Sequence, residues 1–534
     1  MSATTAGPAL GLYLGLYPKA NFRVTTGAKA PGTALRQALW YFRDETIAVP
    51  VAGVRVASFT PGMHVDEDLR SWLAAQGDTV PCDYPPLVWT AAPDVVAGGR
   101  LSEDGKRLAT PARDLAFSLA PRNPLNRSYF DASSARYFST RPVKVRGTIG
   151  RDAIVARTIW PEEFRLADLP PPRALPAAPS AARALRNRMR ADPQGGARTP
   201  YTAETLWQRA GTSGDLRGRG VIGIMVNGAQ GDDDEAHAGH FALVTGRVQD
   251  DGAIGDWLAN NFYTLDAESE KGILAAPVPL DNYLADLNAG QAWYRPSCML
   301  VAVLSNERAP TLLQSALGRV YNQFWRHQLV YYHPSTNCTS ISVDTLHSLG
   351  WNVPARGAKR RFSAALGFPW LVLTERSVAR AMLIADYLWT EPTQMLPAAA
   401  FEEIGGSLLA LAHDTPRASG NPGKLQSMLA SDLDALVYLQ FPQLPSSRAW
   451  GYAPAATLRE YRKRLPRNPA KLKTVPVPAR PFPMALRDAD LMPPPMPASE
   501  YIAAVWSLLS VAGIPWLVRR WWRLHGERRR LQRP

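Results

Sequence analysis

Short runs of consecutive apolar residues alternate with amphipathic segments between residues 220 and 445 of this 534-residue chain. The run Val221–Val226 (VIGIMV) contains no polar side chain, which is typical of a strand buried on both faces. Further strand patterns occur over Phe241–Val248, Leu258–Leu265 and Met299–Leu304. Apolar residues at helical spacing predict helices over Leu280–Leu287, Thr311–Leu329 and Cys338–Leu349, with further helical patterns to about Leu439. The alternation predicts an α+β domain over residues 201–445.

The sequence on either side of this unit has a different character. Strand patterns in Glu45–Phe59 and Val143–Ile159 predict a β-rich N-terminal domain over residues 1–166. Residues 167–200 are dominated by Pro, Ala and Arg, which predicts a linker or a lone helix. Residues 446–499 are rich in proline and basic residues, and we interpret them as a second linker.

The C-terminal region combines an apolar segment with a basic end. Tyr501–Val518 contains 18 residues without a charge, enough for a helix of about 27 Å, close to the thickness of a bilayer core. Arginine and tryptophan residues follow it directly, as is typical of a membrane border. We therefore predict a transmembrane or interfacial helix within residues 500–534, in the inner membrane, with a buried helix of a soluble domain as the alternative.

The same distribution of charge argues against nucleic-acid binding. The net charge is +14, but residues 457–534 alone carry 16 Lys and Arg against 5 Asp and Glu. The preceding 456 residues are therefore almost neutral and offer no broad basic face. The side of the membrane on which the rest of the chain lies stays undecided. Basic residues after the apolar segment favour a cytoplasmic C-terminus, which would require export of the preceding residues. The chain start, however, lacks the basic region of a signal peptide.

Three cysteines are too few and too scattered for a disulfide framework, and no CxxC pair suggests a zinc site. Cys338 differs from Cys82 and Cys298 because it follows Asn337, a strong N-cap residue, at the predicted start of a helix. The free N–H groups and the dipole of a helix start favour a thiolate and could stabilise an oxyanion. The alternative is a buried structural cysteine, which is the commonest role of a free thiol.

A histidine lies where a polar, acidic segment meets an apolar strand. His240 follows Gly239, and at the start of a rigid strand it is well placed to act as a general base for a thiol. Two alternatives are a metal site formed with His237 and the acidic run, and a histidine that only packs. His333 is the reserve candidate for the base.

Taken together, these segments resemble the circularly permuted papain-like amidase superfamily, in which the histidine strand precedes the cysteine helix. The likeness is greatest to the N-terminal periplasmic domain of bacterial lipoprotein intramolecular transacylases. It rests on Gly239–Val244 (GHFALV), on Tyr283–Leu304 and on Tyr331–Leu346, which contains the sequence Asn-Cys-Thr-Ser. The resemblance covers about residues 220–350 and implies a papain-like antiparallel sheet with helices.

The resemblance also implies roles for individual residues. Cys338 would be the nucleophile and His240 its base, and the strand after the histidine would supply a third polar residue. Of Asn260, Asn261 and Tyr263 on that strand we select Asn261, because an amide can orient an imidazole. Asn260 is the close alternative.

The function expected from these features is that of a membrane-associated cysteine-dependent acyl hydrolase or acyltransferase. The substrate would be a lipid-linked or peptidoglycan-linked acyl group, attacked as an ester or amide to give an acyl-enzyme. The chemistry needs no metal and no organic cofactor. The alternative is a non-catalytic binding or adaptor module, held at a membrane by its C-terminal helix.

Overall fold

The described part of the chain in this computed structural model comprises fifteen segments with short gaps between them. These are residues 13–30, 35–42, 45–120, 130–173, 175, 180–190, 200–228, 237–265, 274–287, 295–357, 361–375, 378–413, 422–445, 453–466 and 468–471. The largest cluster of buried apolar side chains forms a single core, with members from Ala30 to Ala456. The β-rich N-terminal region therefore shares its core with the rest of the molecule.

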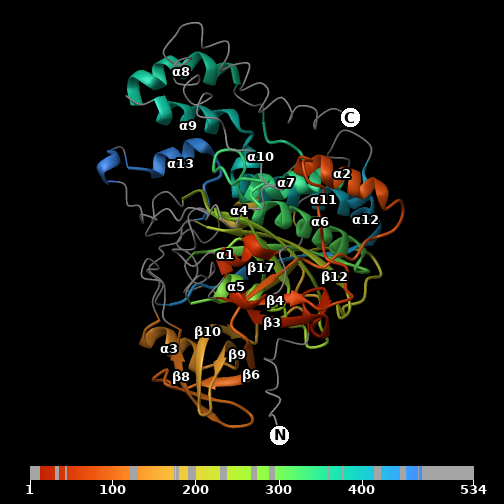
Figure 1. Ribbon diagram of the computed structural model, residues 1–534, viewed down its shortest axis with the longest axis vertical. Coiled ribbons are helices and arrows are strands. Elements are labelled where there is room, and N and C mark those ends of the chain that lie inside the picture. Colours follow the sequence, from red (N-terminus) through yellow and green to blue (C-terminus); the bar gives the residue numbers. More distant parts are fainter. Residues whose placement is uncertain are drawn as a thin grey trace.

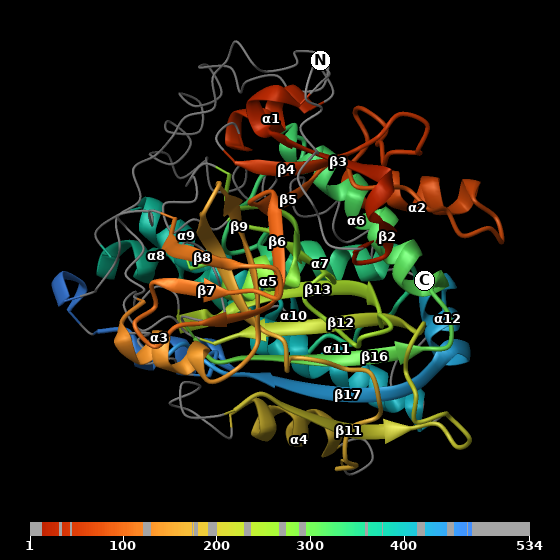
Figure 2. The same ribbon diagram turned by 90° about the horizontal axis from the view of Figure 1, so that it is seen from below.

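A seven-stranded sheet with antiparallel neighbours forms the centre of the molecule (Figure 2). Its order is β11-β17-β16-β12-β13-β14-β15. The bounds in this order are Thr202–Gln208, Leu433–Phe441, Ser297–Leu304, Gly220–Asn227, His240–Arg247, Leu258–Asn261 and Ala276–Pro279. The four strand patterns predicted from the sequence correspond to β16, β12, β13 and β14 at the middle of this sheet, although β14 ends at Asn261 and not at Leu265. The α+β class is confirmed.

Helices pack on the sheet and connect its strands (Figures 1 and 2). Helix α6 packs on β12 and β13, α7 on β13, and α11 on β12 and β17, while α5 leads out of β15. The bounds of these and the neighbouring helices are α4 Ser180–Met189, α5 Leu280–Ala285, α6 Arg308–Trp325, α7 Cys338–Ser348, α8 Arg361–Glu375, α9 Val378–Trp389, α10 Pro392–Met395, α11 Pro397–Ala412, α12 Lys424–Asp432 and α13 Leu458–Arg464.

The N-terminal region contains a three-stranded sheet and a small closed barrel. The sheet has the order β3-β4-β5, and the barrel has the order β10-β8-β7-β6-β9. Strands β9 and β10 pair in antiparallel fashion and cover the strand pattern Val143–Ile159 that the sequence predicts. The bounds are β1 Tyr13–Leu14, β2 Tyr17–Pro18, β3 Phe22–Thr26, α1 Arg36–Phe42, β4 Thr46–Pro50, α2 Val65–Ala75, β5 Val88–Ala91, β6 Asp94–Leu101, β7 Arg107–Ala109, β8 Asp114–Leu119, α3 Ala132–Ser139, β9 Val143–Ile149 and β10 Ala153–Pro161.

Four sequence expectations need correction or qualification. The helical pattern expected up to Leu439 is wrong at its end, because residues 433–441 form β17. An apolar run buried on both faces of a sheet has no periodicity that separates it from a buried helix. The strand expected over Glu45–Phe59 stops at Pro50. The supposed linker 167–200 contains α4, which packs on α11. The C-terminal segment 500–534 lies outside the described residues, as does most of 446–499; within the described ranges no helix has both the length and the apolar character needed to cross a bilayer.

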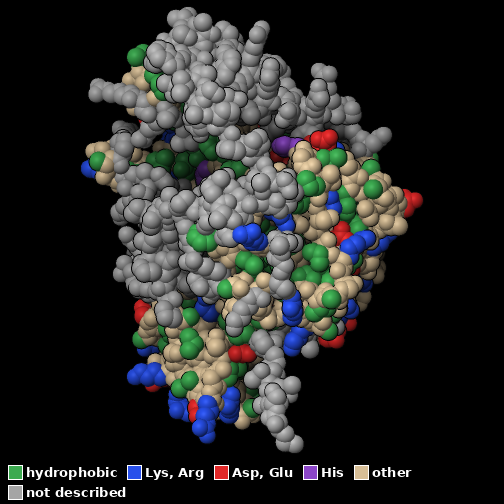
Figure 3. Space-filling view, in the orientation of Figure 1, with side chains coloured by type: hydrophobic (Ala, Val, Ile, Leu, Met, Phe, Trp, Pro, Cys, Tyr) green, Lys and Arg blue, Asp and Glu red, His purple; other side chains and the backbone are tan. Residues whose placement is uncertain are grey.

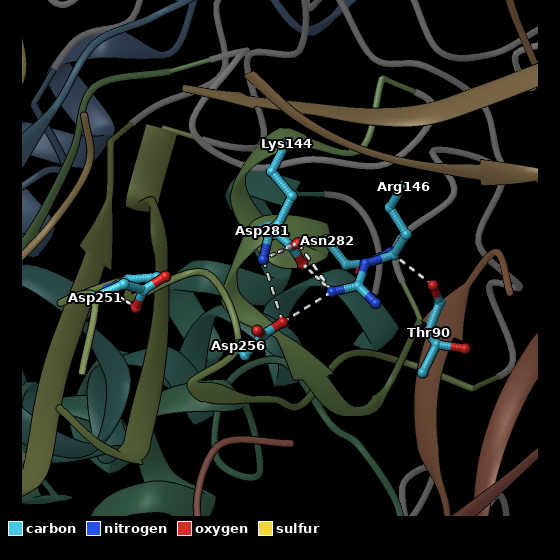
Figure 4. Close-up of polar contacts among 8 residues, drawn as sticks. Thr90, Lys144, Arg146, Asp251, Asp256, Asp281 and Asn282 are labelled. Carbon is cyan, nitrogen blue, oxygen red and sulfur yellow. Dashed lines mark hydrogen bonds and ion pairs between the residues drawn. The ribbon is translucent and has the colours of Figure 1, made fainter. Parts of the chain in front are cut away.

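A buried group of four charges joins the barrel to the central sheet (Figure 4). Arg146 of β9 lies 2.9 Å from the Asp281 carboxylate of α5 and 3.1 Å from Asp256, and both Arg146 and Asp281 have fully buried side chains. Lys144 Nζ lies 2.9 Å from Asp281 and 3.2 Å from Asp256. Burial alone would raise the pKa of Asp281, but Arg146 and Lys144 hold that pKa below its usual value.

We expect Asp281→Asn to lower the free energy of unfolding by about 3–5 kcal/mol, because it leaves two buried cations with one carboxylate. Asp114→Asn is the matched control, since Asp114 pairs with Arg107 at 3.4 Å where both side chains are more than half exposed. The control should change stability by less than about 1 kcal/mol. Denaturant unfolding measures both values, and equal small losses would contradict a structural role for the cluster.

Candidate functional site

Helix α7 begins at Cys338 because the residue before it caps the helix. The Asn337 side chain accepts hydrogen bonds from the N–H groups of Thr339 at 2.8 Å and Ser340 at 3.0 Å. Ser340 Oγ accepts one in return from the Asn337 N–H at 2.8 Å, which completes a capping box. The Asn337 side chain therefore does not bond to the N–H of Cys338. The predicted start of the helix is confirmed.

The thiol of Cys338 is enclosed by polar groups although its residue is only 5% exposed. The Phe241 N–H, the Thr339 hydroxyl and the Tyr331 hydroxyl hydrogen-bond to the sulfur and lower the pKa of the thiol. Burial acts in the opposite direction and is stronger, so the pKa lies above its usual value. The helix start thus does not by itself make a thiolate, and the resting cysteine is a neutral thiol.

His240 is the first residue of β13, and the chain before it leaves no room for a side chain. Gly239 has φ +85°, and an added Cβ would lie 2.5 Å from the Asn227 carbonyl oxygen and 2.7 Å from Pro454 Cβ. Only glycine fits that close approach. His240 pairs with Asn227 across the sheet, so the ring direction is fixed by a strand and not by a loop.

Asn261, the residue selected from the sequence, contacts the histidine. Its Oδ1 lies 2.5 Å from His240 Nε2, and its Nδ2 donates to the Leu274 carbonyl at 2.8 Å. Because Nδ2 faces a carbonyl, Oδ1 must face the ring, and an oxygen can only accept. The contact therefore fixes the proton of the neutral imidazole on Nε2 and leaves Nδ1 as the basic atom.

Asn260, the close alternative, has a different position. It lies opposite Leu243 in the register of β13 and β14, so it is on the other face of the sheet from Asn261. Its side chain exchanges hydrogen bonds with Gln314 of α6 at 2.9 and 3.0 Å. Asn260 therefore joins the sheet to a helix and does not touch the histidine.

The cysteine and the histidine lie in one buried cluster. Sulfur contacts the N–H of Phe241, the residue that follows His240. Both residues also interact with Arg295 and Tyr283, and the Tyr283 ring centre is 6.4 Å from that of His240. Within the described chain, the hydrogen-bond partners of the sulfur do not include the imidazole itself.

Arg295 acts on the two candidate residues in different ways. The pKa of His240 is lowered from 6.5 to about 3, first by burial and second by the Arg295 charge, against the opposing hydrogen bond of Asn261. The same charge lowers the pKa of Cys338 and so favours a thiolate. A neutral imidazole and a neutral thiol are the resting state that this electrostatic arrangement favours.

His333 and His237, the other histidines considered from the sequence, have different surroundings from His240. His333 is exposed, and its Nδ1 lies 2.5 Å from the Tyr387 hydroxyl of α9. His237 is buried, and its carbonyl accepts from the Ala455 N–H at 3.1 Å. The acidic run Asp232–Glu235 lies outside the described residues. Among the residues that the structure does describe, no group of three His, Cys, Asp or Glu side chains is arranged to hold a metal ion.

Sequence reasoning did not find three members of the cluster. Tyr331 stands seven residues before the cysteine and was only part of a motif, while Tyr283 and Arg295 come from a helix and a loop distant from both candidates. The Tyr283 hydroxyl donates to Asn227 Oδ1 at 2.5 Å, and Asn227 is the partner of His240 in the sheet. No local pattern marks such residues, because only the pairing of strands brings them together.

The low pKa of His240 predicts a specific loss of stability in acid. The unfolded chain binds a proton on this histidine below about pH 6.5 and the folded protein does not, so stability falls with pH until about pH 3. Between pH 7.5 and 5 the loss attributable to His240 is about 2 kcal/mol. Unfolding free energies of wild type and His240→Gln should therefore converge or cross as the pH falls.

His413→Gln, at an exposed position after α11, is the control and should keep the pH dependence of the wild type. If wild type and His240→Gln lose stability in parallel, the histidine is not held neutral by its surroundings.

Comparisons with known proteins do not place the chain in a family. No family model matches it, and neither a curated protein nor a solved structure shows significant similarity to it. The geometry of the cluster around Cys338, His240 and Asn261 is therefore the basis for any statement about function.

Proposed function

We propose that the protein is a cysteine-dependent acyl hydrolase or acyltransferase, with Cys338 as nucleophile and His240 as general base. The observation that carries the proposal is the 2.5 Å contact between His240 Nε2 and Asn261 Oδ1. It orients the ring and sets its tautomer within the cluster that holds a cysteine at a helix start. A base positioned by a third group beside a nucleophile is the arrangement that covalent catalysis requires.

The proposed reaction begins with both groups neutral. His240 Nδ1 takes the proton of the Cys338 thiol while the sulfur attacks the carbonyl carbon of an ester or amide. The imidazolium then gives this proton to the departing alcohol or amine, and a thioester remains on the sulfur. Water, or an acceptor alcohol or amine, loses its proton to Nδ1 as it attacks the thioester carbonyl. The C–S bond then breaks, and the departing sulfur takes this proton from Nδ1, which restores the thiol and the neutral imidazole. Asn261 serves as a positioning residue throughout, because its Oδ1 accepts from Nε2–H.

The oxyanion formed in each step needs a hydrogen-bond donor near the sulfur. The Cys338 N–H is a suitable donor, since the Asn337 cap uses the N–H groups of Thr339 and Ser340 instead. The Tyr331 hydroxyl hydrogen-bonds to this N–H. In our proposal the carbonyl oxygen of the substrate takes the place of the hydroxyl. The imidazole and the sulfur then approach each other as the complex forms, as catalytic hydrogen bonds often tighten on binding.

Aromatic rings line this cluster and favour an apolar acyl group. Tyr263 and Tyr283 lie with ring centres 6.3 and 6.4 Å from the His240 ring, and the Tyr331 ring is 6.3 Å from that of Tyr263. We therefore retain a lipid-linked acyl group as the favoured substrate, with a peptidoglycan-linked one as the alternative. Membrane association through Tyr501–Val518 remains part of the proposal.

A non-catalytic binding module is the second candidate, and one observation favours it. Burial raises the pKa of the Cys338 thiol, and a buried neutral thiol is typical of a structural cysteine. The two candidates differ in whether the sulfur forms a covalent adduct, which can be measured directly.

We expect a long-chain acyl p-nitrophenyl ester to leave its acyl group on Cys338, visible as an added mass on the corresponding peptide. Cys338→Ala should abolish the adduct, and His240→Gln should slow its formation by a factor of about 10²–10⁴ because the general base is lost. Mass spectrometry of quenched reactions measures both.

Cys298→Ala is the matched control. Cys298 is a buried cysteine of β16, 3% exposed, and its removal should leave acylation of Cys338 unchanged. Equal labelling of wild type and Cys338→Ala would refute the proposal. Wild-type protein that binds the acyl compound without forming an adduct would support the binding module instead.

A further inference from the structure

Helices α8 and α9 form a hairpin at the end of the molecule opposite the barrel (Figure 1). The two helices pack on each other, and Leu371 of α8 and Ala381 and Ala385 of α9 are buried. None of these three residues belongs to the main core cluster of the described chain. The hairpin is thus a projecting element with its own small contact surface.

Large apolar side chains cover the outside of this hairpin. Trp370 is 66% exposed and Leu373 75%, and on α9 Val378 and Met382 are 38% and 41% exposed. Hydrophobic side chains are visible at the surface over α8 in Figure 3. Single exposed apolar residues are ordinary, but a group on one projecting element marks an interaction surface. We name the group Trp370, Leu373, Val378 and Met382 the apolar tip.

The charges that flank the apolar tip in the sequence indicate what it contacts. Residues 362–374 contain no charged side chain, while residues 359–380 as a whole contain five Lys and Arg and only one acidic residue, Glu375. The basic residues are Lys359, Arg360, Arg361, Arg376 and Arg380. An apolar surface on a segment that basic residues flank in the sequence matches a bilayer with anionic headgroups, whose acyl chains would surround the apolar side chains.

The lengths of the helices decide how such a hairpin meets a bilayer. Helix α8 has 15 residues and α9 has 12, which correspond to about 22 and 18 Å. A helix needs about 30 Å to cross the hydrocarbon core. We propose that the α8–α9 hairpin inserts its apolar tip into one leaflet of an anionic bilayer and does not cross it. This contact is separate from the C-terminal segment and does not require the proposed acyl chemistry.

Hydrogen bonds connect the hairpin to the loop that leads to Cys338. The Tyr332 hydroxyl donates to Asp386 of α9 at 2.6 Å, and His333 Nδ1 lies 2.5 Å from the Tyr387 hydroxyl. This loop ends at the Asn337 cap of α7. A hairpin held in a leaflet therefore places the cysteine cluster next to the membrane surface.

A fluorophore at the tip tests the proposal in the full-length chain. The label is an environment-sensitive nitrobenzoxadiazole on Leu373→Cys, in a background with Cys82→Ser and Cys338→Ala so that no acyl chemistry contributes. With vesicles of phosphatidylcholine and phosphatidylglycerol we expect a blue shift and a several-fold rise in emission, quenched by lipids that carry a spin label near the headgroup. Vesicles of phosphatidylcholine alone should give a smaller change, because the basic flank has no anionic partner.

Arg151→Cys is the labelled control, since Arg151 lies between β9 and β10 of the barrel and its side chain is 97% exposed. Its emission should not change with vesicles. If vesicles sediment the protein while the label at residue 373 does not respond, the chain binds through another segment and the proposal is wrong. The proposal is also wrong if the label at residue 373 already has blue-shifted emission without vesicles, relative to the label at residue 151. A shift that grows with protein concentration would show that a second copy of the chain covers the apolar tip. A shift independent of concentration would show that a segment of the same chain covers it.

Discussion

The buried charges between the barrel and α5 hold together the parts of the molecule on which the cysteine cluster depends. Arg146 and Asp281 have no exposed side-chain surface, so neither charge is tolerated without the other. Asp281 lies two residues before Tyr283 on the six-residue helix α5. Tyr283 in turn bonds to Asn227, the sheet partner of His240. The position of the histidine is thus tied, through one short helix, to a barrel that contributes no residue to the cluster.

The cluster is a buried site in which both Cys338 and His240 are neutral. Burial disfavours the charged form of both residues, so it raises the pKa of the cysteine and lowers the pKa of the histidine. Arg295 breaks this symmetry, since a fixed positive charge disfavours an imidazolium and favours a thiolate. A site of this kind creates its charges when the substrate arrives, and the developing negative charge on sulfur is stabilised mainly by the arginine and by N–H groups.

Sequence patterns located the elements of the fold better than the contacts between them. Val221–Val226 was predictable as a strand because its residues are uniformly apolar, and Cys338 as a helix start because Asn337 caps locally. Strand β17 was not predictable, since its apolar run Ala435–Leu439 (ALVYL) contains only one β-branched residue and fits a helix equally well. The choice between Asn260 and Asn261 depends on the register of two strands, which no spacing within one strand contains. The selection of Asn261 rested on its amide chemistry, and that chemistry applies equally to its neighbour.

The close contact at Gly239 links the histidine to the far end of the sequence. Pro454 packs against this glycine, and the next residue bonds to the backbone of His237. The chain therefore leaves the described part of the molecule at Lys471, only 17 residues after touching the histidine turn. Residues 472–500 can extend at most about 100 Å, whatever their conformation. This length sets an outer limit on the distance between Lys471, the last described residue, and the start of the segment Tyr501–Val518.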